Sequence, residues 1–188
     1  MRFYNAMPDE NIYVDKVFKW IVDLTLVVLL AVFFYTYMCQ SVQVIGNSMS
    51  DKLENGDHVL VDKISYELSE PKRYDVIAFT KKEKNGEETE YIKRIIGLPG
   101  DKVQIIEGRI YVNGKKIDYN SKRDKIVNPG LASQEIELDY DEYFVIGDNW
   151  NNSEDSRSAN IGPVEEEDMI GKAWFHLKSG SAGIGVIK

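Results

Sequence analysis

Ser48 is a candidate nucleophile in the stretch GNSM, which lies shortly after a strongly apolar segment. A serine acts as a nucleophile only when a neighbouring group takes its proton. The chain contains two histidines, His58 and His176, and each falls in a segment that alternates like a β-strand. A Ser-His-Asp triad is recognised by geometry that sequence does not show. It therefore stays open here but is not favoured.

Lysine is the other known proton acceptor for a nucleophilic serine. Its free pKa of about 10.4 disfavours the neutral amine by roughly 4.6 kcal/mol at pH 7, so a lysine base must be desolvated. Most lysines here stand beside other charges, whereas Lys93 lies in the apolar segment YIKRIIGLPGD. Strand alternation places Tyr91 and Lys93 on one face and Arg94 on the other. We therefore expect one of the two charges to be buried or at an edge. The alternative, in which Lys93 lies on a solvated face, stays open.

A third polar segment, GDNWNNSEDSR at residues 147–157, follows the apolar run EYFVI. Asn, Asp and Ser side chains bond to their own backbone and build tight loops. Taken by itself, the segment predicts only a loop.

Residues 20–39, WIVDLTLVVLLAVFFYTYMC, contain one charge, Asp23. Twenty helical residues cover about 30 Å, which matches a bilayer core, and aromatic residues stand near both ends. A cleaved signal peptide is disfavoured because the run has no small-x-small exit. A buried core helix is disfavoured because the remaining chain is too small to cover a helix that is apolar all round. The sequence predicts one transmembrane helix at 20–39, and Lys and Arg before it mildly favour a cytoplasmic segment at 1–19.

The predicted span determines where Ser48 lies. Ser48 comes eight residues after Gln40, and eight extended residues reach about 26 Å. We therefore expect the candidate nucleophile near the outer membrane surface, in an extracytoplasmic domain at 40–188.

The segment after residue 40 predicts a mostly β domain. Short runs rich in β-branched and aromatic residues, bounded by turn residues, predict strands, and Asn113-Gly114 predicts a hairpin. The predicted strands are 57–64, 74–79, 91–97, 102–106, 109–112, 142–147 and 170–177. Residues 115–140 are polar and interrupt this pattern, so we expect an excursion from the main sheet.

Composition excludes several classes of function. The chain has 23 Lys and Arg against 31 Asp and Glu, a formal charge of −8, which argues against nucleic-acid binding. A single cysteine, Cys39, allows no intrachain disulfide. Two isolated histidines with one cysteine make no zinc motif, and no metal site or cofactor is expected.

The three polar segments, in this order behind one span, resemble the conserved boxes of bacterial type I signal peptidases, the membrane-bound Ser-Lys endopeptidases of family S26. GNSM with Leu53 resembles the nucleophile box, and GDHVLVDK the next one. YIKRIIGLPGD resembles the lysine box, and GDNWNNSEDSR the last one. The resemblance implies a mostly β fold of the signal-peptidase and LexA-like type, in which 115–140 is a variable excursion.

The resemblance also implies a role for each matching residue. Ser48 would be the nucleophile and Lys93 the general base, and Ser153 would orient the lysine amine. Asp155 and Arg157 would hold the last loop. Some members have a serine hydroxyl as an oxyanion donor where this chain has Gly46, which leaves the second donor unidentified. Positions that match the lining of shallow substrate pockets, together with Gly46, are Val42, Val44, Met49, Leu53, Tyr91 and Ile92.

One departure from the family pattern follows Ser48. Asp51 and Lys52 stand where the family has proline and threonine, so the turn after the nucleophile loses a rigid residue. Two alternatives stay open. One is a soluble Ser-Lys autoprotease, which the predicted span disfavours. The other is a specialised or non-cleaving membrane-tethered relative that assists assembly of surface proteins such as pilins.

The resemblance implies the partners and the location as well. The substrates would be the signal peptides of exported preproteins, cut after small-x-small sites. The enzyme would lie in membrane lipid near the secretion translocon, as a single-pass protein with its N-terminus in the cytoplasm.

Overall fold

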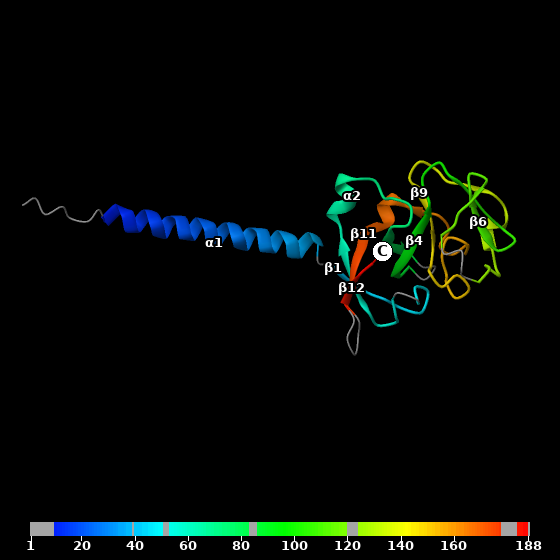
Figure 1. Ribbon diagram of the computed structural model, residues 1–188, viewed down its shortest axis with the longest axis horizontal. Coiled ribbons are helices and arrows are strands. Elements are labelled where there is room, and N and C mark those ends of the chain that lie inside the picture. Colours follow the sequence, from blue (N-terminus) through cyan, green and yellow to red (C-terminus); the bar gives the residue numbers. More distant parts are fainter. Residues whose placement is uncertain are drawn as a thin grey trace, which may run out of the picture. The chain divides into compact units, whose positions relative to one another are not determined.

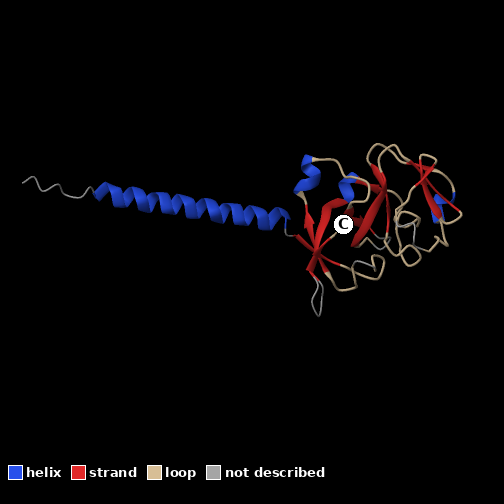
Figure 2. Cartoon of the chain, viewed as in Figure 1, coloured by secondary structure: helices blue, strands red, loops and turns tan. Residues whose placement is uncertain are grey.

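The computed structural model describes residues 10–38, 40–50, 53–82, 86–119, 124–177 and 184–187. The chain divides into two compact units, residues 1–37 and residues 38–188. The first contains one helix, and the second is built mainly from strands (Figure 2). The prediction of a mostly β fold behind one N-terminal apolar helix is therefore confirmed.

The N-terminal helix, α1 (Glu10–Met38), is long enough to cross a membrane (Figure 1). Its segment Tyr13–Tyr37 has a hydropathy of 2.3, and none of it is buried within the protein. A helix that is apolar on every side and packs against no protein core is suited to lipid. The helix includes residues 20–38 of the predicted span but begins at Glu10; residue 39 lies outside the described part of the chain.

The main sheet of the second unit has eight strands in the order β1-β2-β11-β3-β4-β9-β10, with β12 also paired to β11. Every pairing is antiparallel. The strands are β1 (Gln40–Gln43), β2 (His58–Asp62), β3 (Val76–Lys82), β4 (Glu88–Gly97), β9 (Glu142–Ile146), β10 (Val164–Glu165), β11 (Met169–Leu177) and β12 (Ile184–Val186).

A smaller sheet of four strands has the order β7-β6-β5-β8. Its strands are β5 (Lys102–Ile106), β6 (Arg109–Val112), β7 (Lys115–Lys116) and β8 (Ile136–Glu137). Asn113 and Gly114 join β6 to β7 with φ values of 53° and 71°, as a tight hairpin turn requires. The chain thus leaves the main sheet after Gly97 and returns at Glu142, so the excursion is longer than the predicted 115–140.

All seven predicted strands are present, but several elements were not predicted. These are β1, β12, the two-residue strands β8 and β10, and three short helices, whereas β7 is the second arm of the predicted Asn113-Gly114 hairpin. The helices are α2 (Ile64–Leu68), η1 (Gly130–Ser133) and η2 (Glu166–Asp168). Most of these elements are too short for a hydrophobic period to be visible.

A cluster of buried residues from five strands covers one face of the main sheet, which we call the inner cluster. Val42 comes from β1, Val59 and Val61 from β2, Ala78 from β3 and Ile92 from β4. Its other members are Val44, Met49, Leu53, Val76 and Ala173. Met49 follows Ser48 directly, so the loop that carries the candidate nucleophile is held by core packing.

Among the strands of the main sheet, β1 and the first part of β4 each have an edge that no described strand pairs. β1 pairs with β2 only, from Gln40 to Gln43. β4 pairs with β3 from Glu88 to Arg94, but with β9 only from Arg94 to Gly97. One edge of β1 and one edge of residues 88–93 therefore have backbone groups available to an added strand.

Candidate active site

Ser48 and Lys93 are in direct contact. Lys93 Nζ donates a hydrogen bond of 2.8 Å to Ser48 Oγ. Lys93 comes from the middle of β4 and is only 3 % exposed, whereas Ser48 lies in the turn after β1. The sheet therefore joins two residues that are 45 positions apart in sequence. When the amine is neutral, the same contact lets the Ser48 hydroxyl donate its proton to Lys93.

Burial lowers the pKa of Lys93 to about 8, and the negative charges of Asp155 and Glu154 oppose this shift. The charged ammonium is disfavoured where water is excluded, because no solvent dipoles compensate its charge. A pKa of about 8 leaves the neutral amine only about 1.4 kcal/mol less stable than the ammonium at pH 7. Lys93 thus meets the desolvation requirement for a lysine base.

Arg94, the next residue, is buried too, with 1 % exposure. The sequence predicted that one of the two charges would be buried or at an edge, and in the structure both are buried. Arg94 is buried because Asp148 accepts from both Nε (2.8 Å) and Nη2 (2.7 Å). The Tyr74 carbonyl accepts from Nη1, and the Tyr119 hydroxyl donates to Asp148. The two faces of β4 thus carry two buried cations, one paired and one beside Ser48.

The loop at 147–157 is organised around the carboxylate of Asp155, which is fully buried. Arg157 donates to it from Nε (2.7 Å) and Nη2 (2.8 Å). Gly147 N–H and Ser153 Oγ donate to it as well, at 3.1 and 2.7 Å. The expected Asp155–Arg157 pair is therefore present. The single hydroxyl proton of Ser153 is donated to Asp155.

The same loop holds the Ser48 segment in place. Asn149 N–H donates to the Ser48 carbonyl oxygen at 2.8 Å, and Asn149 Nδ2 donates to Ser50 Oγ at 2.8 Å. Gly147 allows this close approach, because a Cβ there would lie 2.2 Å from Ser153 Oγ and 2.6 Å from the Ser48 carbonyl oxygen. A side chain at position 147 would push the two segments apart.

A small cleft of about 70 Å³ opens beside Ser48 and Lys93. Of the predicted pocket residues, Val44, Met49, Tyr91 and Ile92 line it. Val42 and Leu53 lie deeper, in the inner cluster. Tyr91 lies on the same face of β4 as Lys93, opposite to Ile92, and its ring stacks on Phe79 at 5.6 Å.

Sequence reasoning missed four residues of the cleft lining: Gln43, Ile45, Thr89 and Glu90. Gln43, Ile45 and Glu90 are direct sequence neighbours of predicted residues, and Thr89 lies two positions before Tyr91. Extending each box by one or two strand positions would have found them.

Three other predicted positions lie in different surroundings. Gly46 has a φ of +82°, which favours glycine, and its N–H donates to Asn55 Oδ1 at 2.9 Å. The Nδ1 atom of His58 lies 3.1 Å from Ser41 Oγ. His176 is in β11, paired with Gly185 of β12. Asp51 and Lys52 lie outside the described residues, so the turn that departs from the family pattern has no structural account.

Known proteins share the sequence of this chain over most of its length. Residues 17–177 match the family described as "Signal peptidase, peptidase S26". "Probable signal peptidase I-2" of Synechocystis sp. is 36% identical over 154 residues, which cover 80% of this chain and 68% of that protein. "Signal peptidase I S" of Bacillus subtilis is 32% identical over 178 residues, which cover 90% of this chain and 94% of that protein.

Among solved structures, a signal peptidase I from Enterococcus faecalis matches with 28% sequence identity and a TM-score of 0.42. The match covers 55% of this chain and 97% of that chain. The assignment to a family rests on the family match and on the relatives above 30% identity. These matches extend over most of both chains. The chain belongs to the signal peptidase I family, the serine peptidases of family S26.

Proposed function

We propose that this chain is a membrane-anchored serine endopeptidase that cleaves signal peptides from exported preproteins after small-x-small sites, with Ser48 as nucleophile and Lys93 as general base. One observation carries the proposal: the 2.8 Å contact between Ser48 Oγ and the amine of a lysine that is 3 % exposed. A solvated lysine would be a cation at pH 7 and could not take a proton. Here burial brings the pKa of Lys93 to about 8.

The substrate binds as an extended strand between β1 and residues 88–93 of β4. Both segments have an unpaired edge, so backbone hydrogen bonds to the peptide supply affinity on both sides. The cleft between them holds only about 70 Å³ beside Ser48. Space of that size fits the side chain of a small residue such as Ala, which accounts for a small residue before the cut.

Neutral Lys93 accepts the proton of Ser48 as Oγ attacks the scissile carbonyl carbon. The resulting oxyanion is stabilised by backbone N–H groups, with Ser48 N–H as one donor. Collapse of the tetrahedral intermediate breaks the peptide bond, and Lys93 returns the proton to the leaving amine. The mature protein departs, and the signal peptide stays as an ester on Ser48. Water, deprotonated by Lys93, then hydrolyses this ester.

Ser153, Asp155 and Arg157 position this dyad rather than react. Asp155 receives the Ser153 hydroxyl and the Arg157 guanidinium, so the Ser153 oxygen is oriented and its lone pairs are available to the Lys93 amine. This arrangement keeps the amine directed at Ser48.

The proposed location follows from α1. With the N-terminal segment in the cytoplasm, residues 40–188 lie outside the membrane, and Ser48 lies within ten residues of Met38, where the helix ends. Signal peptides leaving the translocon present their cleavage site at this surface, in contact with lipid. No cofactor enters the reaction, and nucleic acid is not a partner.

The full-length protein, purified in detergent, should release the signal peptide from a preprotein with a small-x-small site. N-terminal sequencing of the product should show a single cut directly after the second small residue. Mass spectrometry of enzyme quenched in acid during turnover should reveal an ester of the signal peptide on Ser48. Intact preprotein after prolonged incubation would instead support the non-cleaving assembly role.

The pH dependence of cleavage should report the protonation of Lys93. Because only the neutral amine accepts the Ser48 proton, kcat/KM should rise with pH and level off above a midpoint near 8, the pKa of Lys93. Asp155 and Glu154 raise this pKa, so Glu154→Gln should move the midpoint to lower pH. Initial rates from pH 5.5 to 10 measure both effects.

The control for this shift is Glu137→Gln, which removes an exposed carboxylate on β8, in the smaller sheet. Its midpoint should equal that of the unmodified protein. Two outcomes would contradict Lys93 as the base. One is a midpoint of the kcat/KM profile that Glu154→Gln does not move, and the other is a kcat/KM that falls as the pH rises.

A further inference from the structure

One residue of the 147–157 loop, Asn149, holds the nucleophile segment at three points. Its backbone N–H donates to the Ser48 carbonyl oxygen at 2.8 Å. Its side-chain Nδ2 donates to the Asn47 carbonyl oxygen at 3.1 Å and to Ser50 Oγ at 2.8 Å. A carbonyl oxygen only accepts hydrogen bonds, so the nitrogen end of the amide must face Asn47. Both amide hydrogens of Asn149 therefore bond the segment that carries Ser48.

The bond to Asn47 acts on the peptide unit whose nitrogen belongs to Ser48. This unit is trans, so it is planar and its C=O and N–H point in opposite directions. The Asn149 amide on the Asn47 oxygen therefore fixes the direction of the Ser48 N–H, which is the oxyanion donor in the proposed reaction. Within the described part of the chain, no acceptor bonds this N–H, so it is available to a substrate.

Other polar groups near the nucleophile are engaged elsewhere. Gly46 has no hydroxyl, and its N–H donates to Asn55 Oδ1 at 2.9 Å. Among the described residues that line the cleft, Lys93 is the one cation, and it serves as the base. Arg94 lies on the opposite face of β4, where it pairs with Asp148. None of these four groups is therefore placed to stabilise the oxyanion.

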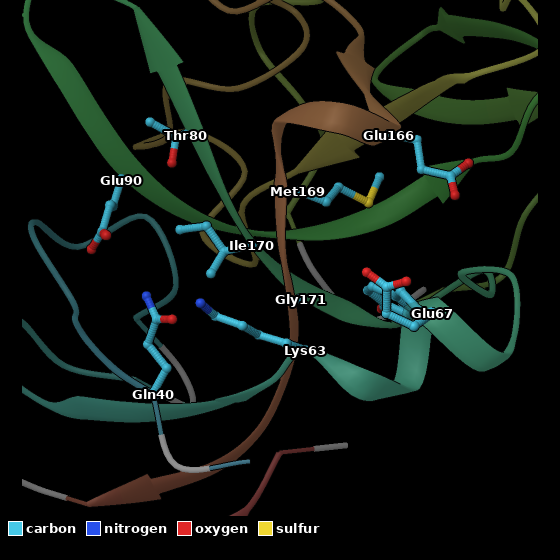
Figure 3. Close-up of a pocket in the computed structure, with 10 residues that line it drawn as sticks. Gln40, Lys63, Glu67, Thr80, Glu90, Glu166, Met169, Ile170 and Gly171 are labelled. Atoms are coloured by element: carbon cyan, nitrogen blue, oxygen red, sulfur yellow. The ribbon is translucent and has the colours of Figure 1, made fainter. Parts of the chain in front are cut away.

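A further cation, Lys63, lies outside the catalytic cleft. It lines a neighbouring groove of about 480 Å³. Figure 3 shows its amine end on the side of Gln40, at the start of β1. Of all these groups, only the backbone N–H of Ser48 is free to bond the oxyanion, so the rate of the reaction depends on the direction of that N–H.

We propose that Asn149 is a positioning residue for the oxyanion: its side chain, through the Asn47 carbonyl, orients the Ser48 N–H. This role rests on the proposed function, because it takes Ser48 as the nucleophile. A donor that is already oriented needs no reorganisation when charge develops on the carbonyl oxygen of the substrate. A hydrogen bond accepted by the oxygen of a peptide unit also strengthens the bond that its N–H donates.

The size of the expected effect follows from a second bond to the same oxygen. The Asn47 carbonyl also accepts from Ser50 N–H, at 3.1 Å within the turn. Loss of the Asn149 amide would therefore leave this peptide unit less restrained but not free. Removing a direct oxyanion donor lowers kcat by about 10²–10³-fold. We expect a smaller loss here, on the order of tenfold, because the donor itself remains.

Cleavage kinetics of the full-length protein in detergent test this role. Asn149→Ala and Asn149→Leu offer no donor to the Asn47 carbonyl, and each should lower kcat on the order of tenfold with KM unchanged. The pH midpoint of kcat/KM should stay where the unmodified protein has it, because the surroundings of Lys93 are kept. Ser50→Ala should lose less activity than Asn149→Ala, because the bond to Asn47 remains.

A pair of inhibitors separates positioning from a general structural role. With a peptide aldehyde that ends in a small-x-small sequence, Ser48 Oγ bonds to the aldehyde carbon, the Ser48 proton moves to Lys93, and the aldehyde oxygen becomes an oxyanion. The matching peptide alcohol has no carbonyl and binds without this step. In both Asn149 variants the inhibition constant of the aldehyde should rise on the order of tenfold, as expected for a mimic of the transition state. That of the alcohol should not change.

The matched control is Asn151→Ala in the same loop, since Asn151 Nδ2 donates to the Lys125 carbonyl oxygen at 3.0 Å. It should keep kcat and both inhibition constants. An unchanged kcat in the Asn149 variants, or an equal rise of both inhibition constants, would overturn the positioning role and leave the proposed function standing. A loss in Ser50→Ala as large as that in Asn149→Ala would do the same. Absence of Ser48-dependent cleavage would overturn both.

Discussion

Replacing Ser48 by Ala should abolish measurable preprotein cleavage, and replacing Lys93 by Met should do the same. We expect each loss to be roughly 10⁴-fold or more, because neither half of a nucleophile–base pair works without the other. For the same reason, the double variant should be no less active than either single variant. Rates from quantified gels at high enzyme concentration measure all three.

The Lys93→Met variant also separates chemistry from folding. Methionine has a similar length and no charge, so it removes the cost of burying an ammonium. The unfolding temperature of this variant in detergent should equal or exceed that of the unmodified protein. Lys115→Met, at an exposed position of β7, should retain full activity. Substantial cleavage by Lys93→Met would remove Lys93 from the mechanism.

The second large effect concerns stability. Asp148→Asn should lower the free energy of unfolding by about 3–5 kcal/mol, because it leaves the Arg94 guanidinium buried without a counter-charge. Both side chains are 1 % exposed, and the pair is joined by two hydrogen bonds. Urea unfolding of the full-length protein in detergent, followed by tryptophan fluorescence, measures this loss.

The matched control is the exposed pair Lys82–Glu88, at 3.9 Å, whose side chains are 78% and 62% exposed. Glu88→Gln should cost less than about 1 kcal/mol, because water screens this pair. Replacing both buried partners, as Arg94→Met with Asp148→Leu, should restore most of the stability that Asp148→Asn loses. An equal, small effect of Asp148→Asn and Glu88→Gln would show that the buried pair does not hold β4 to the 147–157 loop.

The sequence predicted the strands well because their signals are local. Alternating β-branched residues and turn pairs such as Asn113-Gly114 need only neighbouring positions to be read. It also singled out Lys93, because a lysine in an apolar strand is unusual whatever it contacts. By contrast, β1 reads QSVQ, with one apolar residue. Its strand conformation depends on pairing with β2, which a local pattern does not show.

The electrostatic environment was harder to predict than the fold. Sequence alternation correctly put Lys93 and Arg94 on opposite faces but could not show that both faces of β4 are covered. Arg94 is buried because Asp148, 54 positions later, meets its guanidinium.

The unpaired edge of β4 has a consequence for how copies of this protein meet. A free strand edge accepts another copy as readily as it accepts a substrate, which is a common route to aggregation. This edge carries Glu88 and Glu90, both exposed, in a chain of formal charge −8. Two copies that paired through residues 88–93 would bring these carboxylates together. We therefore expect repulsion between these carboxylates to disfavour self-association through this edge.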